Sequence, residues 1–456
     1  MRTIHPILFA VVSLTNAAVA QFVPLTNSST PHLDAKICPD ASHVAFRDGA
    51  SQLGIVDIAG PVERNLFTST TSIVSSYVWA PDASGIYFTD GNQIRHVPTA
   101  GGTATLVAPA LAGTDVRLWC IDPTGTSLYG TRRDAATNTA FLFRVPANGG
   151  SAPADLVSRT GTLDEVDIDE TGSYVLLRRW NGTVPVPVTF ERYDVAAGVA
   201  LPMITINQRA ESAHWITIGT HFVVAMASAA HPFAPQIARI AATGTIDFLV
   251  DEGGIAQRPY FPGTGEEVVF ETDDPTVSGG TAIGMVPNHG GAVIMVPGTM
   301  PLFLNGTSTT GGLTVDPAIT KIAISASTWV WQVPQIMVAD IDETLHVHPR
   351  LTLGSQFLID LDVPPGMIGA AALADGLTTS VPVMLPGIGG ECWLDIAPGH
   401  MEIMLLGVAP ATGGVVGSYT VPTLPAFQGL RVWVQGAVLD AALTGNFTHF
   451  GSLRVF

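Results

Sequence analysis

Charged side chains are scarce in this sequence. They make up 13% of the 456 residues, about half of the usual share, and only Lys36 and Lys321 are lysines. The formal net charge is −18. Because binding to phosphates requires clustered positive charge, nucleic acid and anionic membrane surfaces are unfavourable partners. The excess of acidic groups most simply keeps the protein soluble.

Cysteine is also rare, with three residues in the chain, Cys38, Cys120 and Cys392. Three cysteines are too few for a disulfide framework, even in an oxidising compartment. Cys38 and Cys120 belong to sequence repeats that should not be neighbours in the fold. We therefore expect all three to be buried, unpaired thiols.

Catalytic motifs are missing as well. The sequence contains no Gly-x-Ser-x-Gly, no His-Glu-x-x-His and no phosphate-cradling glycine loop. We therefore predict no catalytic residue, no metal ion and no cofactor, and we favour a protein that is not an enzyme.

Long apolar runs are confined to the N-terminus. Met1-Arg2, the apolar residues 7–14 and the small residues Ala18-Val19-Ala20 are typical of a secretory signal peptide over residues 1–20. No later segment has the roughly 18 uninterrupted apolar residues of a spanning helix. We expect a secreted or periplasmic protein with no integral membrane segment after the signal is removed.

Glycine and proline are abundant, with 47 and 33 residues. Frequent turns, many Val, Ile and Thr residues, and the absence of a sustained 3.6-residue apolar period after the signal predict an all-β protein.

A strand–turn–strand unit recurs along the chain. Its clearest copy spans residues 77–88, where Pro81-Asp82-Ala83-Ser84 supplies the turn. A Gly-Gly hairpin, as in Val97-Pro-Thr-Ala-Gly-Gly102, joins two further strands. Four-stranded units of about 42 residues are typical of a β-propeller. The repeats predict seven blades, with six or eight as alternatives, and the turns lie near Pro39, Pro81, Pro123, Glu170, Ile218, Gly263 and Pro317.

The repeat resembles the WD40-like repeats of the TolB-type propeller family, which also occur in the propeller domain of prolyl-oligopeptidase-like peptidases. The resemblance covers about residues 30–345. The usual Ser-Pro-Asp-Gly turn is eroded in every copy, and the fifth and sixth repeats keep only the hydrophobic spacing. The resemblance implies a propeller that serves as a scaffold, a binding domain or, in some members, an enzyme.

The repeat is lost after residue 350. Short strand-like runs separated by Pro and Gly continue to the C-terminus, which favours an Ig-like or jelly-roll β-sandwich over residues 351–456, joined to a propeller over residues 21–350. Its Val421-Pro-Thr-Leu-Pro425 stretch resembles β-sandwich modules at the C-termini of exported bacterial proteins. That resemblance implies no activity.

Several polar groups have two interpretations. Residues 167–172 resemble the start of a calcium loop but align with the blade turns. His346 and His348 have the spacing of metal ligands on one strand face, or belong to an exposed strand. His214 and His231 either face the central channel or are packed or surface histidines, and His289 is read as a turn residue.

Five residues form the predicted ligand-binding set. They follow the second strands of the third and fourth repeats, so their loops should open on the same face of adjacent blades. Together they would form a positive patch with one aromatic face, suited to a carboxylate or an acidic sugar. The alternative is that these are solvated arginines paired with Asp134 and Asp164. The residues are Arg132, Arg133, Arg178, Arg179 and Trp180.

The sequence thus predicts an exported, monomeric, non-catalytic binding or scaffolding protein. Its partner would be an envelope protein or an extracellular polysaccharide, held at the loop face or in the channel. Two alternatives remain. One is a propeller lyase or hydrolase that acts on a polysaccharide at the channel mouth, and the other is a structural surface protein.

Overall fold

The structure is a computed structural model. It describes residues 22–454, except for residues 50, 70–73, 151, 181–186, 252–253, 263–266, 274–280, 291–292, 297–302, 305–312, 328–332, 342–344, 349–355, 376–386, 390–391, 393, 395–400, 422 and 424–430. The predicted signal peptide lies outside the described residues. Among these residues there is no helix long and apolar enough to cross a membrane.

Four-stranded antiparallel sheets follow one another along the chain, as the repeats predicted. In each sheet, consecutive strands are neighbours. The first four sheets are β2 (His32–Ile37), β3 (His43–Asp48), β4 (Gln52–Asp57) and β5 (Glu63–Thr68); β6 (Val74–Trp79), β7 (Gly85–Asp90), β8 (Gln93–Pro98) and β9 (Thr105–Ala108); β10 (Thr114–Ile121), β11 (Ser127–Asp134), β12 (Thr139–Pro146) and β13 (Ala154–Thr160); and β14 (Thr162–Ile168), β15 (Tyr174–Trp180), β16 (Val188–Asp194) and β17 (Val199–Ile206).

The next three sheets vary this pattern. The fifth is β18 (Ala210–Thr217), β19 (His221–Ala227), β20 (Pro235–Ala241) and β21 (Ile246–Val250), and the sixth begins with β22 (Ala256–Tyr260), β23 (Glu267–Asp273), β24 (Thr281–Pro287) and β25 (Val293–Val296). The seventh contains β26 (Phe303–Leu304), β27 (Leu313–Val315), β28 (Lys321–Ser327), β29 (Gln335–Asp340) and the N-terminal β1 (Val23–Pro24).

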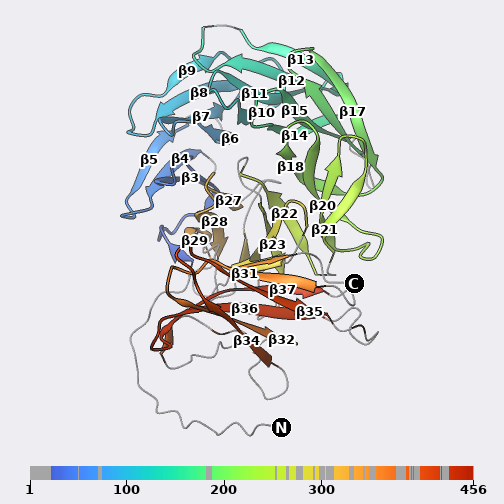
Figure 1. The fold of residues 1–456 in the computed structure, drawn as a ribbon. Coiled ribbons are helices and arrows are strands. Elements are labelled where there is room, and N and C mark those ends of the chain that lie inside the picture. Colours follow the sequence, from blue (N-terminus) through green and yellow to red (C-terminus); the bar gives the residue numbers. More distant parts are fainter. Residues whose placement is uncertain are drawn as a thin grey trace, which may run out of the picture.

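The seven sheets are the blades of a ring (Figure 1). Their first strands contact one another in order from β6 to β22, then β22 contacts β27, and β27 contacts β2. The circuit closes between β2 and β6, where Lys36 Nζ donates to Tyr77 O at 2.7 Å and Trp79 Nε1 donates to Lys36 O at 2.8 Å. The all-β propeller fold predicted from the repeats is therefore confirmed.

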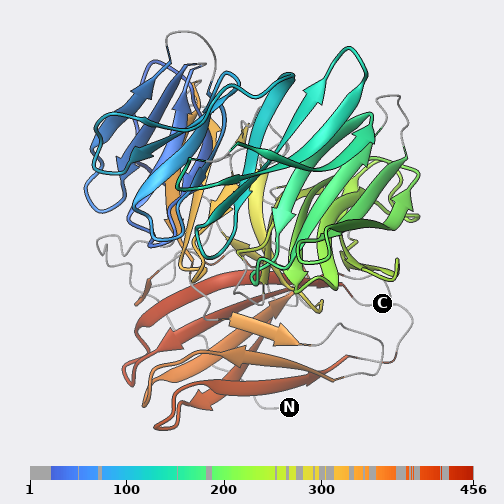
Figure 2. The same cartoon turned by 90° about the horizontal axis from the view of Figure 1, so that it is seen from above.

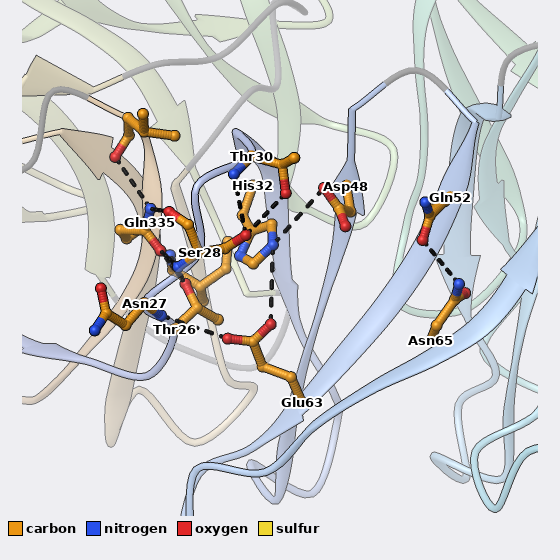
Figure 3. Close-up of polar contacts among 12 residues, drawn as sticks. Thr26, Asn27, Ser28, Thr30, His32, Asp48, Gln52, Glu63, Asn65 and Gln335 are labelled. Atoms are coloured by element: carbon orange, nitrogen blue, oxygen red, sulfur yellow. Dashed lines mark hydrogen bonds and ion pairs between the residues drawn. The ribbon is translucent and has the colours of Figure 1, made fainter.

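The N-terminal strand completes the last blade. Val23 and Pro24 of β1 pair with Val338 and Met337 of β29, so the two ends of the ring share one sheet. The junction is reinforced by Gln335, whose Oε1 accepts bonds from Thr26 Oγ1 at 2.9 Å and Ser28 N at 3.0 Å, as Figure 3 shows. The Gln335 amide nitrogen returns a bond to Ser28 O at 3.0 Å.

Aspartates close several of the turns between first and second strands. Asp122 accepts bonds from Thr126 N and Oγ1, Asp169 accepts one from Ser173 N, and Asp316 accepts one from Thr320 N. These short local bonds mimic backbone turns. They explain why Asp recurs beside the turn prolines, and they give residues 167–172 the role of a blade turn.

The C-terminal strands form two sheets that pack face to face. One consists of β30 (Leu345–His348), β31 (Gln356–Leu361) and β35 (Val415–Thr420). The other contains β32 (Ile368–Ala374), β34 (Met401–Val408), β36 (Arg431–Leu439) and β37 (Gly445–Arg454), with the short β33 (Ile388–Gly389) on β37. Ile359, Leu361, Leu373 and Val434 lie in their shared core.

This C-terminal unit is continuous with the propeller. β37 pairs with β25, the outer strand of the sixth blade, so both belong to one nine-stranded sheet. The strands lie together on one side of the ring in Figures 1 and 2. Its first strand, β30, begins at Leu345 and pairs with β31. The domain boundary predicted at 350/351 lies outside the described residues.

The three cysteines are free thiols. Cys38 and Cys392 are buried, as expected, whereas Cys120 is only half-buried. Cys120 differs because it lies on the wall of the central cavity described below.

The contact between the N-terminal segment and the last blade can be tested by replacing Gln335 with Leu. The variant loses four side-chain hydrogen bonds and leaves Ser28 N and O without this partner, so we expect a loss of about 1–3 kcal/mol in the free energy of unfolding, measured by urea titration. The control is Gln52→Leu, because the Gln52 side chain accepts its hydrogen bond from the exposed Asn65 amide, at 2.8 Å (Figure 3). Its effect should stay within about 0.5 kcal/mol. Equal effects of the two substitutions would contradict the reinforcing role of Gln335.

Candidate functional site

A cavity of about 360 Å³ lies at the centre of the ring. Its walls come from the first strand of every blade and from the turn that follows several of them. Pro39, Pro123, Pro262 and Pro317 line it at these turns. The volume falls within the range of roughly 300–1,000 Å³ that is typical of small-ligand sites.

A bulge interrupts the pairing of the first strand in six blades. In five of them, one residue of the bulge has a positive φ. Such bulges re-aim the side chains that follow them. Because the feature recurs around the ring, it belongs to the architecture of the inner strands. The positive-φ residues are Asp34, Asp115, Glu165, Ser212 and Arg258. The residues that resume the pairing there are Lys36, Arg117, Asp167, His214 and Tyr260.

Lys36 contributes the ammonium group on one side of the cavity. Its Nζ donates to Tyr77 O and lies 5.1 Å from the centre of the Tyr77 ring. Burial lowers the pKa of Lys36 to about 8, and the nearby Asp34 and Cys120 offset only part of this effect. Lys36 is therefore mainly protonated at neutral pH and titrates just above it.

A carboxylate, an imidazole and a phenol come from blades four to six. Asp167 Oδ2 accepts a bond from Trp215 N at 2.8 Å and lies 3.7 Å from His214 Nδ1. The His214 and Tyr260 rings are 5.4 Å apart between centroids. Burial raises the pKa of Tyr260, so its phenol keeps its proton and acts as a hydrogen-bond donor. This wall offers both donors and acceptors to a polar ligand.

Cys120 lies on the wall of the same cavity. Burial, and then the negative charge of Asp167, raise the pKa of its thiol well above the ordinary value. Because the thiolate is the nucleophilic form, Cys120 is not activated for attack. Among the described residues, the group of three side chains able to hold a metal ion is Cys38, Asp40 and His43, and none of these three lines the cavity.

The five residues of the predicted patch are engaged with neighbouring groups. Arg132 forms a bidentate pair with Asp155, at 3.2 and 2.6 Å, and stacks 4.1 Å from the centre of Phe141. Arg133 Nη2 donates to Asn138 Oδ1 at 2.6 Å. Adjacent residues of a strand point to opposite faces, so these two guanidinium groups diverge.

In the fourth blade, Arg178 and Trp180 come together on Asp164. Arg178 donates to both oxygens of Asp164, at 2.9 and 3.1 Å, and Trp180 Nε1 donates to Asp164 Oδ2 at 3.0 Å. Arg178 Nη1 also lies 3.0 Å from Glu165 Oε1. Burial alone would lower the pKa of Arg178, but the attraction of Glu165 and Asp164 outweighs it and raises the pKa.

Arg179 lies on the other face, 3.4 Å from Glu191 Oε1, where Arg159 makes a bidentate pair with the same carboxylate. The structure thus brings two of the five predicted residues together around Asp164, which was one of the two pairing partners considered. Asp134, the other one, accepts bonds from Ala136 N and Thr137 Oγ1 of its own turn.

The histidines singled out in the sequence lie in different parts of the structure. His214 lines the cavity, whereas His231 pairs with Asp251 at 2.6 Å. His346 lies opposite Asp360, and His348 opposite Leu358, in the C-terminal sheet. Sequence reasoning missed Lys36, Asp167 and Tyr260. The available signal was that Lys36 is one of only two lysines and lies in a repeated buried strand.

No protein-family model matches the chain, and no characterised sequence does either. Among solved structures, an oligogalacturonate lyase in complex with manganese aligns at a TM-score of 0.52 and 13% identity, over 72% of this chain and 97% of its own. A puromycin hydrolase aligns at a TM-score of 0.54 and 12% identity, over 77% of this chain and 62% of its own. These likenesses extend to the fold alone and agree with the propeller predicted by resemblance to TolB-type repeats. TolB from Acinetobacter baumannii aligns over 57% and 62% at 16% identity, but its TM-score of 0.39 is too low to carry an argument.

The buried guanidinium of Arg178 can be tested by substitution. Arg178→Met leaves Asp164 and Glu165 without their counter-charge, so we expect a loss of about 3–5 kcal/mol in the free energy of unfolding. Arg179→Met is the matched control, because Glu191 keeps Arg159, and its effect should stay below about 1 kcal/mol. The measurement is chemical denaturation of both variants. A stable Arg178→Met protein would show that Arg178 is not a structural residue.

Proposed function

We propose that this protein is an exported, non-catalytic binding protein that holds the end of a polysaccharide in its central cavity. The observation that supports this most directly is the arrangement of Lys36 on one side of the cavity and Asp167, His214 and Tyr260 on the other. Export is proposed from residues 1–20 of the sequence, which carry the features of a signal peptide.

The chemistry of the cavity suits a polyhydroxylated ligand. Hydroxyl groups both donate and accept hydrogen bonds, and the wall supplies a carboxylate acceptor, a protonated phenol and an ammonium donor. Trp79 and Trp215 are buried in the wall, so the apolar surface they add is rigid. In such a pocket, a few well-placed polar groups fix the orientation of the ligand and provide selectivity.

Lys36 favours an acidic sugar. A sugar carboxylate that replaces the bond between Lys36 and Tyr77 O would form a charged hydrogen bond of the stronger kind, about 1.5–3 kcal/mol. One solved structure with this fold is named as an oligogalacturonate lyase, and oligogalacturonate carries a carboxylate on each sugar. We therefore take digalacturonate as the probe ligand.

A propeller lyase or hydrolase is the second candidate function. It is favoured by the lowered pKa of Lys36, because shifts of this kind bring an amine into the range of a general base. Incubation with polygalacturonate distinguishes these functions: a lyase creates new reducing ends together with unsaturated ends that absorb in the ultraviolet, a hydrolase creates reducing ends without that absorbance, and a binding protein creates neither.

The main test is calorimetric titration of wild type, Lys36→Gln and Lys321→Gln with digalacturonate. We expect wild type and Lys321→Gln to bind equally and Lys36→Gln to bind about tenfold more weakly or worse, as a lost charged hydrogen bond implies. Lys321 is a suitable control because it is the other lysine and pairs with Asp340 on the surface. The double variant Arg133→Ala/Arg179→Ala tests the loop patch as the binding surface. If it loses binding while Lys36→Gln keeps it, the cavity proposal is wrong.

The proposal also predicts a pH dependence. Lys36 carries its charge below a pKa of about 8 and loses it above, so affinity for digalacturonate should be nearly constant between about pH 6 and 7 and fall as the pH rises through about 8. A bound carboxylate raises the pKa of the amine in the complex, so the affinity begins to fall near the pKa of the free protein and goes on falling up to the pKa of the complex. Titrations at several pH values measure this, and Lys36→Gln should show no such fall. A pH-independent wild type would contradict a role for the ammonium group.

A further inference from the structure

The turn of the first blade departs from the pattern of its repeats. In blades three, four and seven the position before the turn is Asp122, Asp169 and Asp316, and each carboxylate closes the turn. In the first blade this position is Cys38, whose sulfur accepts His43 N at 3.0 Å in the same role. In the first blade a thiol therefore occupies the position at which the other three blades close the same turn with a carboxylate.

Two further metal-binding groups face this thiol. Cys38 donates from Sγ to Asp40 Oδ1 at 2.7 Å, and ligand atoms of Cys38, Asp40 and His43 all lie within 4.8 Å of one another. His43 Nδ1 lies 2.5 Å from Ser42 Oγ, which itself donates to Asp40 Oδ1 at 2.7 Å. The Cys38 thiol and the Ser42 hydroxyl thus both donate their protons to Asp40 Oδ1.

The second ring nitrogen of His43, Nε2, has a carboxylate partner of the kind that histidines have in known metal sites. His43 Nε2 lies 3.1 Å from Asp57 Oδ1, and the same oxygen accepts Arg64 Nη2 at 2.9 Å. Metal-binding histidines usually donate their second nitrogen to a carboxylate in this way, which fixes the tautomer and leaves the other nitrogen free to bind the ion. Asp57 would thus be a positioning residue for His43 Nδ1.

We propose that Cys38, Asp40 and His43 form a binding site for a zinc-like divalent transition metal. One thiolate, one carboxylate and one imidazole match the ligands that zinc prefers, whereas a sulfur ligand disfavours calcium and magnesium. The thiol proton is released when the ion binds, so the two anionic ligands balance its charge. A water molecule or the Ser42 hydroxyl would complete four-fold coordination. Because Pro39 lines the central cavity, the ion would lie beside the cavity rim.

The full-length protein, stripped with a chelator, is titrated with Zn²⁺ by calorimetry and with Co²⁺ by absorption. We expect one ion per chain and, with cobalt, a thiolate-to-metal charge-transfer band. Cys38→Ser and His43→Ala should each weaken binding at least tenfold, and Asp57→Asn should weaken it roughly 10–100-fold, as for other positioning carboxylates. Cys392→Ser, another buried cysteine, is the control and should bind as wild type.

Two results would overturn the proposal. The first is a wild-type cobalt spectrum without a thiolate band, which needs no variant and so does not depend on how the variants fold. The second is binding that persists in Cys38→Ser/His43→Ala but disappears in His346→Ala/His348→Ala, which would place the ion on the C-terminal strand. The corresponding turn of the second blade lacks two of the three ligands, because Ala80 and Gly85 occupy the positions of Cys38 and His43. It therefore serves as a comparison within the same chain.

Discussion

The unpaired inner edge of each first strand is the constraint on which this structure depends. A strand at the edge of a sheet exposes backbone groups that need partners. Here the neighbouring blade supplies them through side chains: Lys36 and Trp79 connect the first two blades, and Glu165 and Asp167 accept Ser212 N and Trp215 N between the fourth and fifth. These groups are therefore satisfied only when neighbouring blades pack side by side. The pairing of β1 with β29 extends this packing to the two ends of the ring.

The same side chains give the cavity its polar character. Lys36 and Asp167 line the wall while they bond to the inner edges, so a ligand that engages them must offer an equal or better partner. This favours ligands with many hydroxyl or carboxylate groups over apolar ones, which could not replace the bonds they displace. The architecture thus links the stability of the ring to the chemistry that the cavity can recognise.

The sequence predicted the fold because blade turns are local. Asp122, Asp169 and Asp316 each close a turn with residues four positions on, and such contacts leave a visible repeat. For His214 the sequence offered the central channel as one of two interpretations, but it did not group this residue with Lys36, Asp167 and Tyr260. These four residues come from four blades and meet only when the blades pack around the cavity. The pairing of β25 with β37 is equally non-local. The sequence singled out the arginines as a ligand-binding set but did not show their carboxylate partners, because Asp155 and Glu191 lie on other strands of their blades.

We propose that the central cavity is the ligand-binding site of the propeller. A crystal structure of the protein soaked with digalacturonate tests this most directly. We expect sugar density within the ring, with a carboxylate within hydrogen-bond distance of Lys36 Nζ and a hydroxyl on Asp167. Sugar density confined to the arginines of β11 and β15, with only water between the inner strands, would contradict it.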